Sequence, residues 1–358
     1  MTDASTRAST RTGFGTETGT GTGARELIAG IRSGDRRMLA RAITLAESTR
    51  PEHRQQATVV LDALLDRTGR SVRVGISGAP GAGKSTFIEA LGTHLTTALD
   101  HTVAVLAVDP TSRRSGGSIL GDKTRMERLV NDPKAFVRPS PSGGELGGVA
   151  RRTREALLLC EAFGFDVVLV ETVGVGQSEV AVADMTDLFV LLASPGGGDE
   201  LQGIKRGIIE LADVVLVTKA DGPWAEAARL ACADLRRALQ LLRPKWPADS
   251  GVPSTEARLV SSTTGDGVAD AWASIAAAHA ALLQSGSLAS LREAQARSWF
   301  WNEIRAELFA RFASDAAVAA VLPALEQAVT EGSLTPAGAA SQALAAWSGA
   351  TTAAPDPR

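Results

Sequence analysis

The sequence predicts an α/β protein with a doubly wound, mostly parallel sheet and helical extensions at both ends. Short β-branched runs that are apolar throughout alternate with segments of helical spacing in the middle of the chain. Such strands are buried on both faces, as in parallel sheets covered by helices. Both ends of the chain show helical spacing without strands. A length of 358 residues fits one large α/β domain with extensions or two ordinary domains.

The apolar runs and the segments between them define the expected elements. The predicted strands are 72–77, 103–108, 167–171, 188–193, 214–218 and 258–261. The predicted helices between them are 84–98, 147–163, 200–212, 223–242 and 268–283.

The chain divides into five predicted regions. Residues 1–23 contain eight Thr and five Gly and are expected to form a disordered tail. Asp35 and Pro51 are typical of helix starts, and Thr335 with Pro336 predicts the last helix by the same rule. The regions are a tail (1–23), an N-terminal helical extension (24–70), a P-loop domain (71–284), a C-terminal helical arm (285–349) and a frayed tail (350–358).

Composition excludes several classes of protein. The 37 Lys and Arg nearly balance 40 Asp and Glu, which argues against a nucleic-acid binder. Two Cys exclude a disulfide scaffold and fit the reducing cytoplasm, and four scattered His argue against a His-based metal site. The sequence shows neither a signal peptide nor an apolar run of membrane length, so we expect no membrane partner.

The strongest motif is a phosphate-binding loop between the first predicted strand and its helix. It fits G-x-x-x-x-G-K-[ST], in which backbone N–H groups surround phosphates at a helix N-terminus. Lys84 is expected to reach the β- and γ-phosphates, and the Ser85 hydroxyl to ligate Mg²⁺. The alternative is a glycine-rich turn that matches by chance. The loop consists of Gly78, Ala79, Pro80, Gly81, Ala82, Gly83, Lys84, Ser85 and Thr86.

Acidic residues end two other predicted strands. Asp109 is a candidate for Mg²⁺ or its water, or it caps an Asx turn before a proline. Glu171 ends an apolar strand with Gly174 three residues later, which is the Walker B and switch II arrangement. Glu171 would hold Mg²⁺ or its water, and the Gly174 N–H would contact the γ-phosphate. Gln177 is a candidate to position the attacking water, or it faces solvent after a turn.

Two polar, glycine-rich segments are candidate switches. Residues 116–125 suit a loop that orders around a nucleotide, although any surface loop has this composition. Residues 194–205 include three successive glycines, which predict either a third switch or a plain linker.

A base-recognition motif follows the fifth predicted strand. Thr218, Lys219 and Asp221 resemble the guanine-reading [N/T]-K-x-D pattern, with Thr where many GTPases have Asn. The Asp221 carboxylate can accept hydrogen bonds from guanine N1–H and the 2-amino group, and adenine offers neither donor. The Lys219 stem would cover the base face. Backbone N–H groups after the last strand would bind guanine O6, from Ser261, Ser262 and Thr263.

Together these segments are specific enough to indicate a family. The ordered set GAPGAGKST, AVDPTSRRSGGSILGDKTRM, RPSPSGGELGGVA, ETVGVGQSE, SPGGGDELQGIK and TKAD resembles the MeaB/ArgK family of methylmalonyl-CoA mutase-associated G proteins. The resemblance implies a P-loop GTPase of the SIMIBI class with a C-terminal arm that builds a homodimer. It also implies a chaperone that gates adenosylcobalamin loading of an acyl-CoA mutase by an adenosyltransferase and protects that mutase.

The resemblance also implies roles for particular residues. Lys205 would be a catalytic or coupling residue in a switch that contacts the mutase, and Lys84 and Gln177 are the other catalytic candidates. Mg²⁺ and its waters would bind Ser85, Asp109, Asp122 and Glu171. Cobalamin would enter only through the partner, because the chain lacks a D-x-H-x-x-G motif.

The expected reaction is Mg²⁺-assisted attack of water on the γ-phosphate of GTP, leaving GDP. Arg113, Arg114 and Arg125 are candidates to stabilise charge, and we expect slow basal turnover that the mutase raises. Rival interpretations are a nickel metallochaperone, a signal-recognition-type targeting GTPase, an ATP-dependent kinase accessory to arginine and ornithine transport, and a non-enzymatic scaffold. The scattered His and Cys argue against a nickel metallochaperone. The ETVGVG switch and the low count of four Met argue against a targeting GTPase, and the intact motifs argue against a non-enzymatic scaffold.

Overall fold

Seven parallel strands form the centre of the protein in the computed structural model, which describes residues 20–109, 126–141, 146–172, 178–195 and 206–349. Their order across the sheet is β3-β2-β4-β1-β5-β6-β7, and every neighbouring pair is parallel. The predicted fold class is therefore confirmed. The strands are β1 (Val72–Gly78), β2 (Val103–Asp109), β3 (Ala135–Pro141), β4 (Val167–Glu171), β5 (Leu188–Ala193), β6 (Val214–Val217) and β7 (Ala257–Leu259).

The strand β3 was not predicted from the sequence. Two prolines and Arg138 interrupt its apolar pattern, so it does not read as a buried strand. β3 lies at the edge of the sheet and pairs only with β2 among the described strands. Proline is tolerated on edge strands because its missing N–H removes no ladder bond on the open side.

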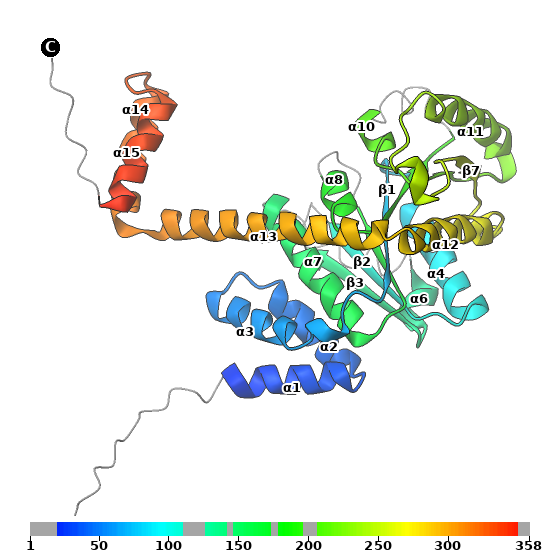
Figure 1. Ribbon diagram of the computed structural model, residues 1–358, viewed down its shortest axis with the longest axis horizontal. Helices are drawn as coiled ribbons and strands as arrows, with labels where there is room; N and C mark the ends of the chain where they lie inside the picture. Colours follow the sequence, from blue (N-terminus) through cyan, green and yellow to red (C-terminus); the bar gives the residue numbers. More distant parts are fainter. Residues whose placement is uncertain (1–19, 110–125, 142–145, 173–177, 196–205, 350–358) are drawn as a thin grey trace, which may run out of the picture. The chain divides into compact units, whose positions relative to one another are not determined.

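Helices cover both faces of the sheet (Figure 1). α4 and α12 pack on one face, and α7 and α8 pack on the other, with α1–α3 against α7. The bounds are α1 (Thr20–Arg32), α2 (Arg36–Ala46), α3 (Pro51–Asp62), α4 (Lys84–Ala98), α6 (Glu127–Asn131), α7 (Leu146–Phe163), α8 (Ser178–Ala183), α10 (Arg206–Ile209), α11 (Ala225–Leu239), α12 (Val268–Gln284), α13 (Ser287–Ser314), α14 (Ala316–Thr330) and α15 (Pro336–Ser348). Short 3₁₀ turns lie at Leu65–Arg67, Gly222–Trp224 and Ala248–Ser250.

Local capping explains where several helices begin. The Asp35 carboxylate accepts from the Arg37 N–H at 2.7 Å, and Pro51 is the first residue of α3. Thr335 caps α15 through the Gly338 N–H at 3.1 Å. These predicted starts are confirmed. The helix α1 begins at Thr20, four residues before the predicted start of the N-terminal extension at residue 24, and Ala24 is buried.

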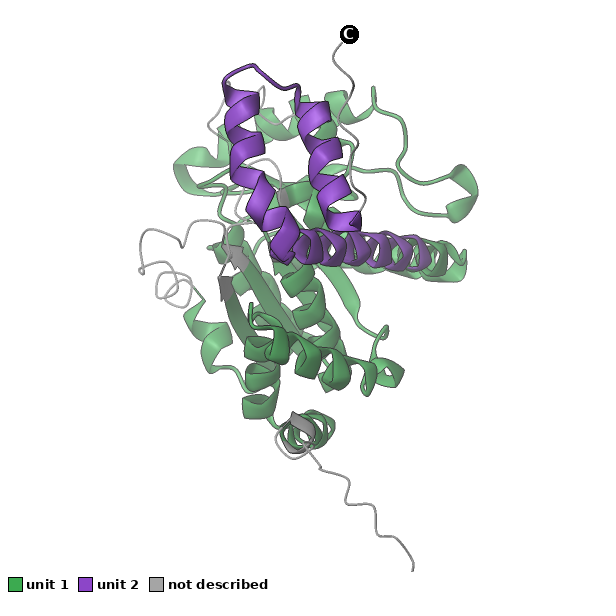
Figure 2. Cartoon of the chain, turned by 90° about the vertical axis from the view of Figure 1, so that its left-hand side faces the viewer, with its two compact units in different colours: residues 1–292 green, residues 293–358 purple. Residues whose placement is uncertain are grey.

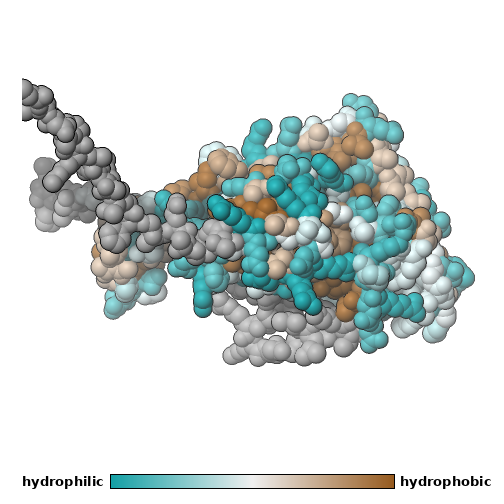
Figure 3. Space-filling model, turned by 90° about the horizontal axis from the view of Figure 1, so that it is seen from below, coloured by the Kyte–Doolittle hydropathy of each residue, from teal (hydrophilic) through white to brown (hydrophobic). Residues whose placement is uncertain are grey.

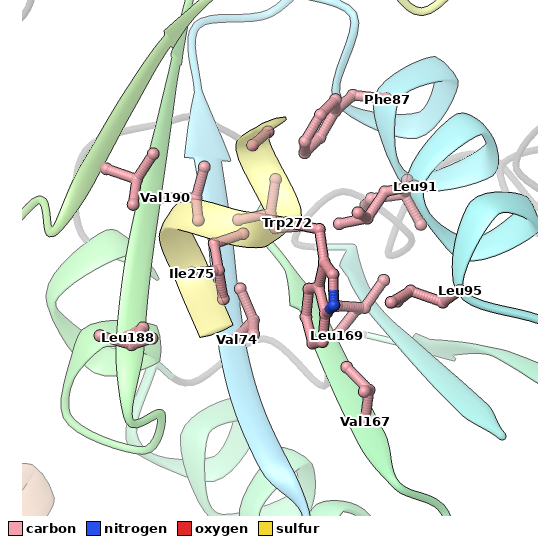
Figure 4. Close-up of a cluster of buried hydrophobic side chains, with 14 of the residues drawn as sticks. Val74, Phe87, Leu91, Leu95, Val167, Leu169, Leu188, Val190, Trp272 and Ile275 are labelled. Carbon is pink, nitrogen blue, oxygen red and sulfur yellow. The ribbon is translucent and has the colours of Figure 1, made fainter. Parts of the chain in front are cut away.

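One hydrophobic cluster joins the central strands to α4 and α12 (Figure 4). Trp272 and Ile275 of α12 lie against β1, and Leu91 of α4 faces them. All three side chains are buried, and burial of each contributes on the order of 2 kcal/mol. This packing holds the helix that follows the β1 loop firmly on the sheet.

An aspartate directly precedes each of three strands and fixes their parallel register. Asp187 precedes β5: its carboxylate accepts from the Arg73 N–H of β1 at 2.8 Å, and its own N–H donates to Arg73 O at 2.9 Å. Asp166 makes the same pair of bonds to Thr102, and Asp213 makes them to Phe189. Because each aspartate uses main chain and side chain together, a slip of one residue would break both bonds.

The carboxylate of Asp187 is also the centre of a buried ionic cluster. Arg292 donates to both of its oxygens, at 2.8 and 2.7 Å, and to the carbonyls of Gly69 and Ser71. The Asp187 side chain is fully buried and that of Arg292 is 18% exposed. His279 of α12 lies 3.7 Å from the same carboxylate. These contacts fasten the beginning of α13 to the amino ends of β1 and β5.

The chain separates into two compact units, residues 1–292 and 293–358 (Figure 2). The second unit contains most of α13 together with α14 and α15, and Phe312 meets Trp347 edge to face at 5.6 Å. The predicted division into five regions stays a prediction.

The described surface is mixed in character. Figure 3 shows a face covered mostly by hydrophilic residues, with smaller hydrophobic areas between them. Among the described helices, none is by itself long and apolar enough to cross a membrane. Together α13 and α14 would meet that requirement, but they are bent by 83° where they join.

We expect Arg292→Met to lower the free energy of unfolding by about 3–5 kcal/mol, because it leaves the buried Asp187 carboxylate without its main counter-charge. Urea titration followed by circular dichroism measures this change. Arg297→Met, at an exposed position of the same helix, is the matched control and should change stability little. Equal, small effects of the two substitutions would contradict the role given to the cluster.

Candidate functional site

The loop 78–86 connects β1 to α4, as the motif predicts. Gly81 has φ 82° and Gly83 has φ 85°, a left-handed conformation that side chains other than glycine rarely adopt. Gly83 is also the N-cap of α4, a helix of 15 residues. Within the loop, Ala82 is fully buried, whereas Pro80, Gly81 and Thr86 are exposed. The first-turn N–H groups of α4 therefore begin where the loop ends, which suits an anion.

The Lys84 side chain lies over its own loop. Its ammonium donates to Gly78 O at 2.8 Å and to Ala79 O at 3.2 Å, and the residue is 9% exposed. Burial lowers the pKa of Lys84, and the negative charges of Glu171 and Glu179 oppose that shift. A phosphate would supply a better counter-charge for this ammonium than two neutral carbonyls do.

Ser85 and Glu171 meet where α4 and β4 come together. The Ser85 hydroxyl donates to Glu171 Oε1 at 3.0 Å, and Glu171 is 8% exposed. A hydroxyl and a carboxylate are hard oxygen donors of the kind that Mg²⁺ prefers, so this pair fits the predicted metal. The described residues include no group of three His, Cys, Asp or Glu side chains able to hold a metal ion by themselves.

Thr218 connects the base motif to the phosphate loop. Its hydroxyl donates to Ala82 O at 2.7 Å and lies 3.1 Å from Ala193 O, and the residue is 2% exposed. The sequence showed only that Thr218 stands where many GTPases have Asn. In the structure this hydroxyl makes a short buried bond between the two loops, an interaction that the sequence alone did not reveal.

The other residues of the base motif lie, like the phosphate loop, at the carboxyl ends of the parallel strands. Lys219 is exposed and has φ 55°, and its ammonium lies 3.4 Å from Ser194 Oγ. Asp221 is partly exposed, two residues further on. The Ala220 N–H donates to Val260 O at 3.2 Å, which joins this loop to the one after β7.

The loop after β7 presents two of its three predicted residues to solvent. Ser262 is partly exposed and Thr263 is exposed, so a base can approach their backbone. Ser261 is 1% exposed: its N–H, which was predicted to reach guanine O6, donates to Asp266 O at 2.9 Å, and its hydroxyl accepts from the Thr264 N–H at 3.1 Å. Its side chain therefore supports the turn from below rather than facing a ligand.

Part of the predicted site falls outside the described residues. Gly174, Gln177, Lys205 and Asp122 lie there, as do the three candidate arginines. Asp109 is the last residue of β2, at the same edge of the sheet as Glu171, but its side chain is not described.

Glu179 is a buried acid near the site that the sequence analysis missed. It lies in the first turn of α8, is 3% exposed, and its charge acts on Lys84. The only sequence signal was an acidic residue at the start of a short apolar helix, which usually indicates a favourable helix dipole and not a site.

Comparisons with known proteins agree with this geometry. The family model of methylmalonyl Co-A mutase-associated GTPase MeaB matches residues 39–317. A Caulobacter vibrioides protein named as a GTPase is 54% identical over 315 residues, 88% of this chain and 95% of that protein. The mouse methylmalonic aciduria type A homolog, mitochondrial, is 47% identical over 331 residues, 90% and 79% of the two chains. The crystal structure of the LAO/AO transport system kinase is 35% identical, with a TM-score of 0.70, and the match covers 90% of this chain and 97% of that one.

We expect Thr218→Val to weaken GDP binding about tenfold or more, because it removes a buried bond to the phosphate loop and leaves Ala82 O unpaired. Titration with a fluorescent GDP derivative measures the affinity. Thr218→Ser keeps the hydroxyl and should bind close to wild type. If valine and serine variants bind GDP equally well, the connection to the loop has no role in binding.

Proposed function

The chain belongs to the MeaB family of methylmalonyl-CoA mutase-associated GTPases, and from that premise we propose that it binds GTP with Mg²⁺ and hydrolyses it at the carboxyl edge of the sheet. The observation that carries the proposal is the connection of three separate segments at this edge. Ser85 contacts Glu171, and Thr218 contacts Ala82. These two bonds join the proposed phosphate, metal and base elements.

The phosphates would lie on the loop 78–86. Its backbone N–H groups and the Lys84 ammonium would hold the β- and γ-phosphates, and the Gly174 N–H would contact the γ-phosphate. The Lys84 ammonium already lies beside the carbonyls of Gly78 and Ala79. In the proposed complex, phosphate oxygens would take the place of these carbonyls as partners of the ammonium.

The base would bind between the loops after β6 and β7. The Asp221 carboxylate would accept the two guanine donors, the Lys219 stem would cover the base, and the backbone of Ser262 and Thr263 would reach O6. Ser261 supports that turn through its buried hydroxyl. The bond from Ala220 N–H to Val260 O supports the proposal because it holds both loops at one spacing.

Mg²⁺ would be held by Ser85 and Glu171, with Asp109 and Asp122 as further ligands or partners of its waters. The bound ion would neutralise charge that develops on the phosphate oxygens. Gln177 and Lys205 are proposed to orient the attacking water and to stabilise charge, and one of Arg113, Arg114 and Arg125 could share the second task. Water would form the new P–O bond as the bond from GDP to the γ-phosphorus breaks, and the protein would contribute positioning and electrostatics without a covalent intermediate.

The partner in this proposal is an adenosylcobalamin-dependent acyl-CoA mutase. The family description and the name of the mouse relative support it. GTP binding and hydrolysis would gate cofactor loading from an adenosyltransferase and protect the mutase, and cobalamin would come only with the partner. We propose that the protein acts in the cytoplasm. Both of its cysteines are free thiols, which is the state expected in a reducing compartment.

We expect slow GTP hydrolysis by the protein alone and a severalfold rise in turnover when a methylmalonyl-CoA mutase is added, because docking would order the catalytic residues. Phosphate release measured with and without the mutase tests this. Lys84→Ala is the control and should abolish turnover in both conditions. Identical turnover with and without a mutase that binds would contradict the chaperone role.

The second unit carries an apolar groove that we assign to a homodimer. The groove, about 860 Å³, lies between α13, α14 and α15 and is lined almost wholly by apolar side chains. Phe309 is 69% exposed and Leu344 is 53% exposed, and Leu308 and Trp347 lie beside them. Apolar surface of this kind is unusual on a monomer. The same arm of a second copy is the proposed occupant, as the family resemblance implies.

We expect Phe309→Glu to convert a dimer into a monomer, because it replaces an exposed apolar ring of this groove with a carboxylate that would lose its hydration on association. Light scattering after size-exclusion chromatography gives the mass. Arg297→Glu, at an exposed position on the same helix, should leave the dimer intact. A Phe309→Glu protein with the mass of the wild-type dimer would rule out this surface.

A further inference from the structure

Two buried hydroxyl groups face each other below the proposed metal site. The Thr172 hydroxyl donates to Ser77 Oγ at 2.8 Å. Thr172 is fully buried and Ser77 is 1% exposed, so neither hydroxyl is open to solvent. A hydrogen bond between buried groups is costly to lose, because water cannot replace the missing partner.

This bond lies where β1 and β4 end. The last pair in their register is Ile76 with Glu171, and the Thr172 N–H then donates to Ile76 O at 2.9 Å. Among the described residues this is the last backbone bond between the two strands, since β4 ends at Glu171 whereas β1 continues beside β5 to Gly78. The contact between Thr172 and Ser77 therefore adds a side-chain bond one step beyond the ladder.

The residues on either side of this bond belong to the proposed site. Glu171 precedes Thr172 and accepts from Ser85 at 3.0 Å. Gly78 follows Ser77 and accepts from Lys84 at 2.8 Å. The bond between these two hydroxyls thus fixes the distance between the end of β4, which carries Glu171, and the phosphate loop.

We propose that Thr172 is a positioning residue: its hydroxyl, through Ser77, keeps the Glu171 carboxylate at the distance from Ser85 that Mg²⁺ binding requires. This inference rests on the proposed GTP and Mg²⁺ site. Valine has nearly the shape of threonine and lacks the hydroxyl, so Thr172→Val removes the bond with little change in packing. Thr172→Ser keeps the hydroxyl and is the matched control.

The test measures binding of a non-hydrolysable GTP analogue as Mg²⁺ is titrated, and GDP binding in EDTA. Thr172→Val should raise the Mg²⁺ concentration for half-maximal analogue binding about five- to tenfold. GDP binding in EDTA should stay at the wild-type level, since the phosphate loop itself is unchanged. Thr172→Ser should resemble wild type in both measurements.

Ser77→Ala removes the same bond from the other side and serves where Thr172→Val does not fold. It should raise the Mg²⁺ requirement by a similar factor, and the double variant should add little, because both substitutions break one interaction. A lower unfolding midpoint with an unchanged Mg²⁺ requirement would show a merely structural role and overturn the inference. Equal loss of GDP binding in EDTA would also overturn it. Failure of the wild-type protein to bind the analogue with Mg²⁺ would instead refute the proposed function on which the inference rests.

Discussion

Every proposed ligand contact depends on the parallel register of the central sheet. Parallel strands place all their carboxyl ends at one edge, so residues distant in sequence meet there. Asp166, Asp187 and Asp213 set that register at the opposite edge, each with a main-chain and a side-chain bond to a neighbouring strand. Carboxylates at the amino ends thus stabilise the sheet, and those at the carboxyl ends are the proposed ligands of metal and base.

At the ligand edge, single hydrogen bonds connect loops that the chain itself does not join. The Thr218 hydroxyl donates to a carbonyl of the phosphate loop, and the Ser85 hydroxyl donates to the acid at the end of β4. The Ala220 N–H donates to the carbonyl of the residue that follows β7. Each bond is shielded wholly or partly from water, where it is stronger than at a surface. These bonds set the spacing of the loops that the proposed nucleotide would contact.

The parts predicted best from the sequence were those encoded locally. The glycines and Lys84 of the phosphate loop define it by spacing alone, and α4 spans the predicted residues 84–98. β3 was missed because an edge strand tolerates prolines that exclude a central one. The bond from Thr218 to the phosphate loop and the burial of Glu179 depend on contacts between distant segments, so no local sequence pattern predicts them. Gln177 and Lys205 lie outside the described residues, so their roles stay predictions.

We propose that the carboxyl ends of the strands form a guanine-nucleotide site. Hydrogen exchange measured by mass spectrometry, with GDP and Mg²⁺ or with ADP and Mg²⁺, tests it most directly. We expect GDP to slow exchange in residues 78–86, 218–221 and 261–264 and to leave the amino edge around Asp187 and Asp213 unchanged, with little effect of ADP. Equal protection by both nucleotides, or protection confined to the arm formed by α14 and α15, would contradict the account.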